Sequence, residues 1–250
     1  MSARARDPAL WGVVPAAGAG RRMQSTTPKQ YLALEGRPVL VHTLERLATL
    51  PGLEGIVVAL ASDDPWWPEL EVEIAVPVYT VTGGAERCHS VAAALEHLAG
   101  MAAGSDWVLV HDAARPCVRP ADLERLVWTL GRDPVGGLLA VPVRDTMKRG
   151  DNEGRVAATV DRDNLWHALT PQMFRLEALR GALAAAIAAG DLVTDEAAAM
   201  ERAGMAPRLV AGHADNIKIT LPEDLALAAF FLRRQDQERL AQQTGLDDGG

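Results

Sequence analysis

Short apolar runs alternate along the chain with longer stretches in which apolar residues recur every three to four positions. Several of the short runs are continuously apolar, which is typical of strands that are covered on both faces of a sheet. The predicted strands are residues 10–14, 55–61, 76–81, 107–111 and 137–141. The predicted helices between them are residues 39–50, 90–98 and 120–130. This order indicates an α/β fold with a mostly parallel central sheet.

The alternation stops after Pro142, where the pattern changes to two exposed strands. Residues 143–149 and 155–160 flank the turn-forming sequence Gly-Asp-Asn-Glu-Gly at 150–154. The pattern predicts a protruding β-arm at about residues 143–170. Two strands cannot form a core of their own, so the arm needs another surface to pack against. A second copy of the chain is the natural candidate, and we expect a homodimer.

Helical spacing returns in the last third of the chain. Residues 176–189 and 195–203 are predicted helices, the second with Thr194 as its N-cap. A final helix is expected from about Thr220, because Thr220 and Glu223 have the spacing of a capping box. From Arg233 the chain is polar and ends in Asp-Asp-Gly-Gly. We therefore expect one folded domain over residues 8–232 and a frayed tail over residues 233–250.

Composition and charge narrow the class of protein. The chain has 250 residues, of which 48% are hydrophobic, and can bury a large core. Its longest apolar runs are far shorter than the ~20 residues of a membrane span, and residues 1–8 lack the apolar stretch of a secretory signal. We expect a cytoplasmic protein with no membrane partner and with both cysteines, Cys88 and Cys117, reduced. The net charge of −8 argues against a nucleic-acid partner.

One basic segment stands out against this acidic background. Residues 8–34 contain no acidic side chain but include Arg21, Arg22 and Lys29. The first strand is followed by Pro-Ala-Ala-Gly-Ala-Gly-Arg-Arg-Met at 15–23 and by Pro-Lys-Gln at 28–30. Small residues let backbone N–H groups approach a phosphate, while the basic side chains supply charge. The loop lacks the Gly-Lys-Ser/Thr of a Walker A motif and the third glycine of the dinucleotide fingerprint. On the loop alone, a solvated glycine turn is an equal alternative.

Asp112 directly follows the predicted strand at 107–111. Ligands of open α/β sheets bind beyond the carboxyl ends of the strands. A carboxylate at this position can hold Mg²⁺ by one bond, while triphosphate oxygens and waters complete the octahedron. The alternative is an Asp that caps a turn. The neighbouring His111 lies on an apolar strand and is expected to be a core residue.

Further motifs follow the glycine loop in a fixed order. They are Gly83-Gly84 with Arg87 and Ser90, Val-His-Asp-Ala-Ala-Arg-Pro at 110–116, Asp145-Thr146, Thr194-Asp195-Glu196 and Asn-Ile-Lys-Ile-Thr at 216–220. Together with the loop, this set closely resembles the 2-C-methyl-D-erythritol 4-phosphate cytidylyltransferases, enzymes of the non-mevalonate route to isoprenoids. The resemblance runs from about Gly12 to Leu232. It implies a single Rossmann-like nucleotidyltransferase domain and a homodimer in which the arm completes the partner's site.

The resemblance also implies an activity and a role for individual residues. The activity is transfer of the cytidylyl group of CTP to a small polyol phosphate, with release of pyrophosphate and with Mg²⁺ as the cofactor. The implied catalytic residues are Arg22, Lys29 and Lys218, beside the metal ligand Asp112. The implied CTP-binding residues are Pro15, Ala16, Ala17, Gly18, Gly20, Gly84, Arg87 and Ser90. The implied acceptor-binding residues are Arg115, Thr146, Arg162, Thr170, Thr194 and Asp215.

Two alternatives remain open from the sequence. Ribitol-5-phosphate cytidylyltransferase shares the loop, the Asp and the late lysine, and residue types alone separate the two acceptors poorly. A non-catalytic nucleotide-binding module is the alternative from another class, since a fold does not imply a function. Ala85 departs from the family, which often carries a polar side chain there, so one base contact is in doubt. Ser90 also has the residue type of a helix N-cap.

Overall fold

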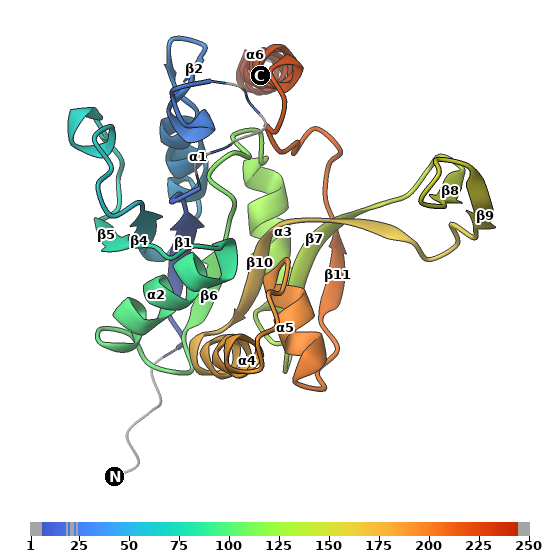
Figure 1. The fold of residues 1–250 in the computed structure, drawn as a ribbon. Helices are drawn as coiled ribbons and strands as arrows, with labels where there is room; N and C mark the ends of the chain where they lie inside the picture. The colour runs from blue at the N-terminus through green and yellow to red at the C-terminus, as the bar shows by residue number, and fades with distance from the viewer. Residues whose placement is uncertain (1–6, 19, 21–22, 24, 245–250) are drawn as a thin grey trace.

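The computed structural model describes residues 7–18, 20, 23 and 25–244, and in this part of the chain a seven-stranded sheet lies between two layers of helices (Figure 1). The strand order is β11-β7-β10-β6-β1-β4-β5. These strands are β1 (Leu10–Pro15), β4 (Leu53–Leu60), β5 (Val78–Thr82), β6 (Trp107–Val110), β7 (Gly136–Pro142), β10 (Trp166–Arg175) and β11 (Arg208–Ala211). All five predicted strands are present, so the α/β class is confirmed.

The sheet is mostly parallel, as predicted. β1 pairs in parallel with β4 and β6, β4 with β5, and β7 with β11, whereas β10 is antiparallel to both of its neighbours. The sequence pattern did not predict β10, which carries Pro171 in its middle. A proline inside a strand is tolerated where the pairing is interrupted. The register between β10 and β7 shifts between Ala168 and Gln172, which accommodates Pro171.

Helices cover both faces of the sheet and bury a separate apolar cluster on each. On one face lie α1 (Val39–Ala48) and α3 (Pro120–Leu130), and on the other lie α2 (Arg87–Ala99), α4 (Leu176–Ala188) and α5 (Glu196–Arg202). In α1 the fully buried Leu40, Leu44 and Leu47 follow helical spacing, which is why this segment forms an amphipathic helix. Four short elements lie in the connecting segments: η2 (Lys29–Tyr31), β2 (Ala33–Leu34) and β3 (Arg37–Pro38) between β1 and α1, and η3 (Trp67–Glu69) between β4 and β5. In the described residues, no helix has both the length and the apolar character that crossing a membrane requires.

The ends of two helices differ from the prediction. Helix α5 is capped by Asp195, whose carboxylate accepts the Ala198 N–H at 2.9 Å, and not by Thr194. Asp and Thr are both good caps, so residue type could not decide between adjacent positions. The last helix begins at Glu223, where the Asp224 carboxylate accepts backbone N–H groups in place of the expected Glu223.

The final helix α6 (Glu223–Thr244) continues past Leu232, so the predicted frayed tail is wrong for residues 233–244. Contacts with the rest of the domain stabilise this part of the helix. The Gln235 side chain is buried and donates to the Cys117 carbonyl at 2.9 Å, and Glu238 lies 2.8 Å from Arg119. Gln235 and Glu238 bind the domain, whereas most other residues of 233–242 are exposed, so the polar character of the segment is that of a helix at the surface. Residues 245–250 lie outside the described residues.

The predicted arm is present. Strands β8 (Met147–Gly150) and β9 (Val156–Val160) form a separate two-stranded sheet that extends away from the body (Figure 1). At its base the Val143 N–H donates to the Leu165 carbonyl at 2.9 Å. The arm is shorter than the predicted 143–170, because residues from Trp166 onward already pair within the main sheet.

Candidate active site

Loops that follow β1, β5 and β6 meet at one edge of the sheet around a cavity of about 310 Å³. Parallel strands place their carboxyl ends at a common edge, which is why segments far apart in sequence converge here. The cavity is lined by eleven residues that the sequence singled out: Pro15, Ala16, Ala17, Gly18, Gly20, Lys29, Gly84, Arg87, Ser90, Asp112 and Lys218. Gln30, Ala85, Glu86, Ala113, Ala114 and Thr220 also line it. Arg21 and Arg22 lie outside the described residues.

Described residues of the glycine loop are held in place by Lys29 and Gln30. Gly20 has a φ of +63°, and an added Cβ would meet the Lys29 side chain at 3.1 Å, so this position favours glycine. The buried Gln30 side chain donates from Nε2 to the Ala16 carbonyl at 2.6 Å. Gln30 thereby fixes the start of the loop. Sequence reasoning gave it no role, although its place directly after Pro28-Lys29 was a signal.

The opposite wall of the cavity is built from the smallest side chains. A Cβ on Gly83 would lie 2.7 Å from both the Ala17 Cβ and the Ser90 Oγ, and a Cβ on Gly84 would lie 2.3 Å from the His89 Cβ. Only glycine fits both positions. Ser90 lies inside α2 and is not its N-cap, which is Glu86. The Ser90 hydroxyl accepts the Gly84 N–H at 3.2 Å and so holds the wall to the helix.

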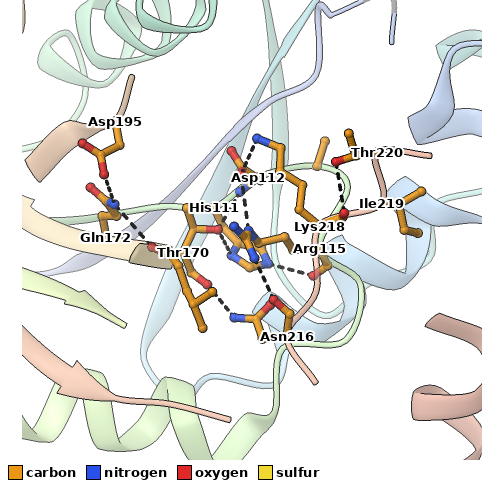
Figure 2. Close-up of polar contacts among 12 residues, drawn as sticks. His111, Asp112, Arg115, Thr170, Gln172, Asp195, Asn216, Lys218, Ile219 and Thr220 are labelled. Carbon is orange, nitrogen blue, oxygen red and sulfur yellow. Dashed lines mark hydrogen bonds and ion pairs between the residues drawn. The ribbon is translucent and has the colours of Figure 1, made fainter. Parts of the chain in front are cut away.

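Two lysines enter the cavity from opposite ends of the chain. Lys29 Nζ donates to the Ile219 carbonyl at 2.9 Å, and Lys218 Nζ lies 2.8 Å from Asp112 Oδ2 (Figure 2). The Ile219 N–H in turn donates to the Ala114 carbonyl at 2.8 Å, which anchors this segment to the loop after β6. The cavity therefore contains a local excess of positive charge in an acidic protein, which suits a polyphosphate.

Asp112 is the centre of this charge cluster. Its Oδ1 accepts from Arg87 Nε at 2.9 Å, and its Oδ2 faces Lys218 and, at 3.4 Å, Arg115 Nε. Burial raises the pKa of Asp112, but the charges of Arg87, Lys218 and Arg115 outweigh burial and hold that pKa well below its usual range. Asp112 is therefore ionised at neutral pH. No group of three or more His, Cys, Asp or Glu side chains suited to a metal occurs in the described part of the chain, so a metal at Asp112 would take its other ligands from phosphates and water.

Arg87 connects Asp112 to a residue that sequence reasoning did not assign. Its guanidinium donates to both carboxylate oxygens of Glu196, at 2.6 and 3.0 Å. Burial lowers the pKa of Arg87, but the charges of Glu196 and Asp112 outweigh burial and keep that pKa above its ordinary value. Burial raises the pKa of Glu196, and the charge of Arg87 opposes that shift. Glu196 stood within a recognised motif, but only the fold brings it to Arg87.

Behind Asp112 lies a buried polar network that sets the backbone of this loop. The Thr170 hydroxyl accepts the Asp112 N–H at 3.1 Å and bonds His111 Nδ1 at 2.9 Å, and His111 Nε2 bonds the Arg115 carbonyl at 3.0 Å. Asn216 Nδ2 donates to the Thr170 carbonyl, and Arg115 donates to the Asn216 carbonyl, each at 2.7 Å (Figure 2). Burial lowers the pKa of His111 to about 4. The expectation that His111 is a core residue is confirmed.

None of the six predicted acceptor-binding residues, all of which the structure describes, lines the cavity. Arg115 and Thr170 touch Asp112 from behind. Asp215 is buried outside the cavity lining, and its carboxylate accepts from Arg119 at 2.6 Å. Thr194 is exposed at the start of α5. Thr146 and Arg162 are exposed on the arm, and Arg162 donates to the Arg144 carbonyl.

Comparisons with known proteins place most of this chain in one family. The sequence model of the family described as 2-C-methyl-D-erythritol 4-phosphate cytidylyltransferase matches residues 10–234. A protein of that name from Pseudomonas aeruginosa is 57% identical over 219 residues, which cover 87% of this chain and 94% of that protein. One from Ectopseudomonas mendocina is 56% identical over 231 residues, or 92% of this chain and 98% of its own length.

Solved structures show the same relationship. A crystal structure described as 4-diphosphocytidyl-2C-methyl-D-erythritol synthase superposes with a TM-score of 0.79 at 35% identity, covering 90% of this chain and 99% of that one. The 2-C-methyl-D-erythritol 4-phosphate cytidylyltransferase of Francisella tularensis superposes with a TM-score of 0.77 at 34% identity, covering 89% of this chain and 99% of that one.

Proposed function

Because the chain belongs to the family of 2-C-methyl-D-erythritol 4-phosphate cytidylyltransferases, we propose that it transfers the cytidylyl group of CTP to 2-C-methyl-D-erythritol 4-phosphate. The products are 4-diphosphocytidyl-2-C-methyl-D-erythritol and pyrophosphate. The observation that carries this conclusion is that Lys29, Asp112 and Lys218 line one cavity of a chain whose relatives bear this name over most of their length. Those relatives favour this acceptor over ribitol 5-phosphate, and favour an enzyme over a nucleotide-binding module.

The chemistry needs positioning and charge more than it needs a base. An oxygen of the acceptor phosphate, already ionised near neutral pH, attacks the α-phosphorus of CTP, and the bond from that phosphorus to the leaving pyrophosphate oxygen breaks. Negative charge grows on the phosphoryl oxygens as this happens. Lys218 and Lys29 supply fixed positive charge at the cavity. The buried, neutral His111 stays behind Asp112 and takes no proton from the acceptor.

Selection of cytosine follows from the small wall of the cavity. Ala16, Ala17, Gly84 and Ser90 line this side of the cavity, and the close packing of Gly83 against Ala17 and Ser90 fixes the position of the wall. A purine is too large for such a site, whereas main-chain groups and the Ser90 hydroxyl can meet a pyrimidine edge. Ala85 lines the cavity but offers no polar side chain, so discrimination against UTP rests on the main chain and the Ser90 hydroxyl.

Mg²⁺ fits the chemistry of this site. Asp112 is an ionised carboxylate at the cavity wall, and a single carboxylate together with substrate phosphates is a usual set of ligands for Mg²⁺. When bound, Mg²⁺ would neutralise charge on the triphosphate and on the departing pyrophosphate. Asp112 would hold the ion, and Lys218 would move its contact from Asp112 toward the phosphates.

The test is pyrophosphate release by the purified protein with CTP, Mg²⁺ and each acceptor in turn. Rapid release with 2-C-methyl-D-erythritol 4-phosphate and slow release with ribitol 5-phosphate is the expected result. A preference for ribitol 5-phosphate contradicts the acceptor assignment, and CTP binding without release from either acceptor contradicts an enzyme. Activity that is unchanged after removal of divalent ions with EDTA contradicts the metal.

We also propose a homodimer in which the arm of one subunit completes the site of the other. Four of the five residues of β9 are exposed, including Val156 at 66%, and a two-stranded hairpin is at best marginally stable by itself. Thr146 and Arg162 lie on this arm and outside the cavity of their own chain. The free, buried thiols of Cys88 and Cys117 suit the reducing cytoplasm, where we propose that the enzyme works.

Complementation tests the shared site. Lys29→Ala and Arg162→Ala damage different halves of each site, so co-refolding the two inactive variants restores one intact site in each mixed dimer. Random pairing makes about half of the dimers mixed, and activity should reach roughly a quarter of the wild-type value. Each variant refolded alone is the control. Absence of recovery in proven mixed dimers means that Arg162 serves its own subunit.

A further inference from the structure

Glu196 is a buried acid that the proposed chemistry does not use directly. It is the first residue of α5, and its side chain is only 1% exposed. Both of its oxygens accept from the two terminal nitrogens of Arg87, at 2.6 and 3.0 Å, in the forked geometry that carboxylates and guanidinium groups prefer. The remaining nitrogen, Arg87 Nε, donates to Asp112 Oδ1 at 2.9 Å. Every nitrogen of the Arg87 guanidinium is thus committed to one of these two acids.

Glu196 is itself held rigidly. The Gln172 side chain on β10 accepts the Ala197 N–H at 2.8 Å and donates to the Asp195 carboxylate at 3.0 Å. Asp195 in turn caps α5. The first turn of α5 is therefore fixed to the central sheet, and the position of the Glu196 carboxylate is set by the fold.

The two carboxylate oxygens of Asp112 face different partners, and this division indicates what the Glu196–Arg87 pair does. Asp112 uses Oδ1 for Arg87 and presents Oδ2 to Lys218 in the cavity. A guanidinium with one acidic partner could leave Asp112 for the phosphates of CTP, but one tied to Glu196 by two charge-assisted bonds cannot do so easily. Glu196 also follows the exposed Thr194 by two residues, so the same contact ties the predicted acceptor loop to Asp112.

We propose that Glu196 is a positioning residue for cytidylyl transfer: it holds Arg87 on Asp112 Oδ1, so that Oδ2 stays directed at the cavity, toward Lys218 in the free enzyme and toward the metal when the metal is bound. This inference rests on the proposed function. Outer partners that orient a metal-binding carboxylate typically contribute roughly 10-fold to 100-fold to metal affinity or activity. Glu196 acts through Arg87 and Asp112 and touches no reacting atom.

The first test is Glu196→Gln, which keeps the shape and removes the charge. We expect kcat to fall roughly 10-fold to 100-fold, with the KM for CTP changed far less. Mn²⁺, used as a probe and followed by electron paramagnetic resonance, should bind the enzyme–CTP complex more weakly by a similar factor. An unchanged kcat together with an unchanged Mn²⁺ affinity overturns the proposal.

Asp106→Asn is the matched control. Asp106 is also 1% exposed and lies just before β6, at the end opposite Asp112, where it accepts the Ala9 and Ala103 N–H groups at 2.9 and 3.0 Å. This variant should lower the melting temperature while leaving kcat and Mn²⁺ affinity unchanged. If it lowers kcat as much as Glu196→Gln does, the effect of Glu196 is general destabilisation and the proposal is wrong.

A double-mutant cycle separates positioning from bulk structure. In the Arg87→Met background, Glu196→Gln should lower kcat no further, because Glu196 acts only through Arg87. The double variant carries no unpaired buried charge from this pair and remains available if Glu196→Gln alone does not fold. Full additivity of the two kcat losses overturns the proposal. A wild-type protein that releases no pyrophosphate overturns the proposed function instead, and Mn²⁺ affinity then still tests Glu196.

Discussion

Replacement of Asp112 by asparagine gives a sharp test of the site, because it separates charge from shape. The side chain is only 8% exposed and lies against three cations, Arg87 at 2.9 Å, Lys218 at 2.8 Å and Arg115 at 3.4 Å. The substituted amide would keep the volume and one carbonyl oxygen but would leave these cations without their shared anion. From its position at a strand end, Asp112 looks dispensable for folding, whereas its contacts indicate the opposite.

The expected loss of stability can be bounded. Removing one partner of a buried ion pair typically costs about 3–5 kcal/mol. Arg87 keeps its bonds to Glu196, and Lys218 is 36% exposed, so water screens its share. We therefore expect Asp112→Asn to lower the free energy of unfolding by about 3 kcal/mol, at the lower end of that range.

The dependence on pH has a definite sign. The pKa of Asp112 is lower in the folded protein than in the unfolded chain, where burial is absent and the three cations are distant. Its stabilising effect is therefore fully present above the unfolded pKa of about 4 and is lost as pH falls below it. The stability difference between wild type and Asp112→Asn should be constant from about pH 5 to pH 8 and should narrow in more acidic solution.

Urea unfolding followed by circular dichroism measures this difference, and pyrophosphate release measures activity in the same preparations. Glu177→Gln, which removes an exposed ion pair with Arg180 on α4, is the control and should change neither quantity measurably. Equal stability of wild type and Asp112→Asn refutes the charge cluster as a source of stability. Activity near the wild-type level at saturating Mg²⁺ refutes the metal role.

Three further predictions follow from the same geometry. Lys218→Met should lower kcat roughly 100-fold, as loss of a preorganised charge at a transition state does, while the KM for CTP changes less; a rise in KM alone makes Lys218 a simple binding residue. His111→Gln should weaken the loss of stability in acid. The folded pKa of His111, about 4, lies below the unfolded value, so the wild type loses up to about 3 kcal/mol of unfolding free energy between about pH 6.5 and 4. If the free energy of unfolding in urea falls equally with pH in both proteins, this prediction is wrong. ATP and GTP should support little pyrophosphate release, because the proposed base site lies against the closely packed wall at Ala17 and Gly84. Equal use of all four nucleotides contradicts the base site.

The sequence by itself determined the sheet edge at which the site forms. The short, continuously apolar runs along the chain are typical of strands covered on both faces, and parallel strands bring their carboxyl ends together. The sequence placed the loop at 15–20 and Asp112 each directly after a strand, and both line the cavity. Gly20 is favoured locally by its φ of +63°, whereas Gly83 is required by tertiary packing, because a Cβ there would lie 2.7 Å from the Ala17 Cβ.

Tertiary structure decided which partner each polar side chain took. Arg87 and Glu196 are 109 residues apart, and their pairing depends on α2 and α5 lying on the same face of the sheet. Likewise the sequence predicted that Gln235 and Glu238 belong to a frayed tail, whereas in the folded chain α6 places them against Cys117 and Arg119. Apolar periodicity reports which face of an element is buried. It carries no information about which distant hydrogen-bonding group lies opposite a polar residue, because that depends on how whole elements pack.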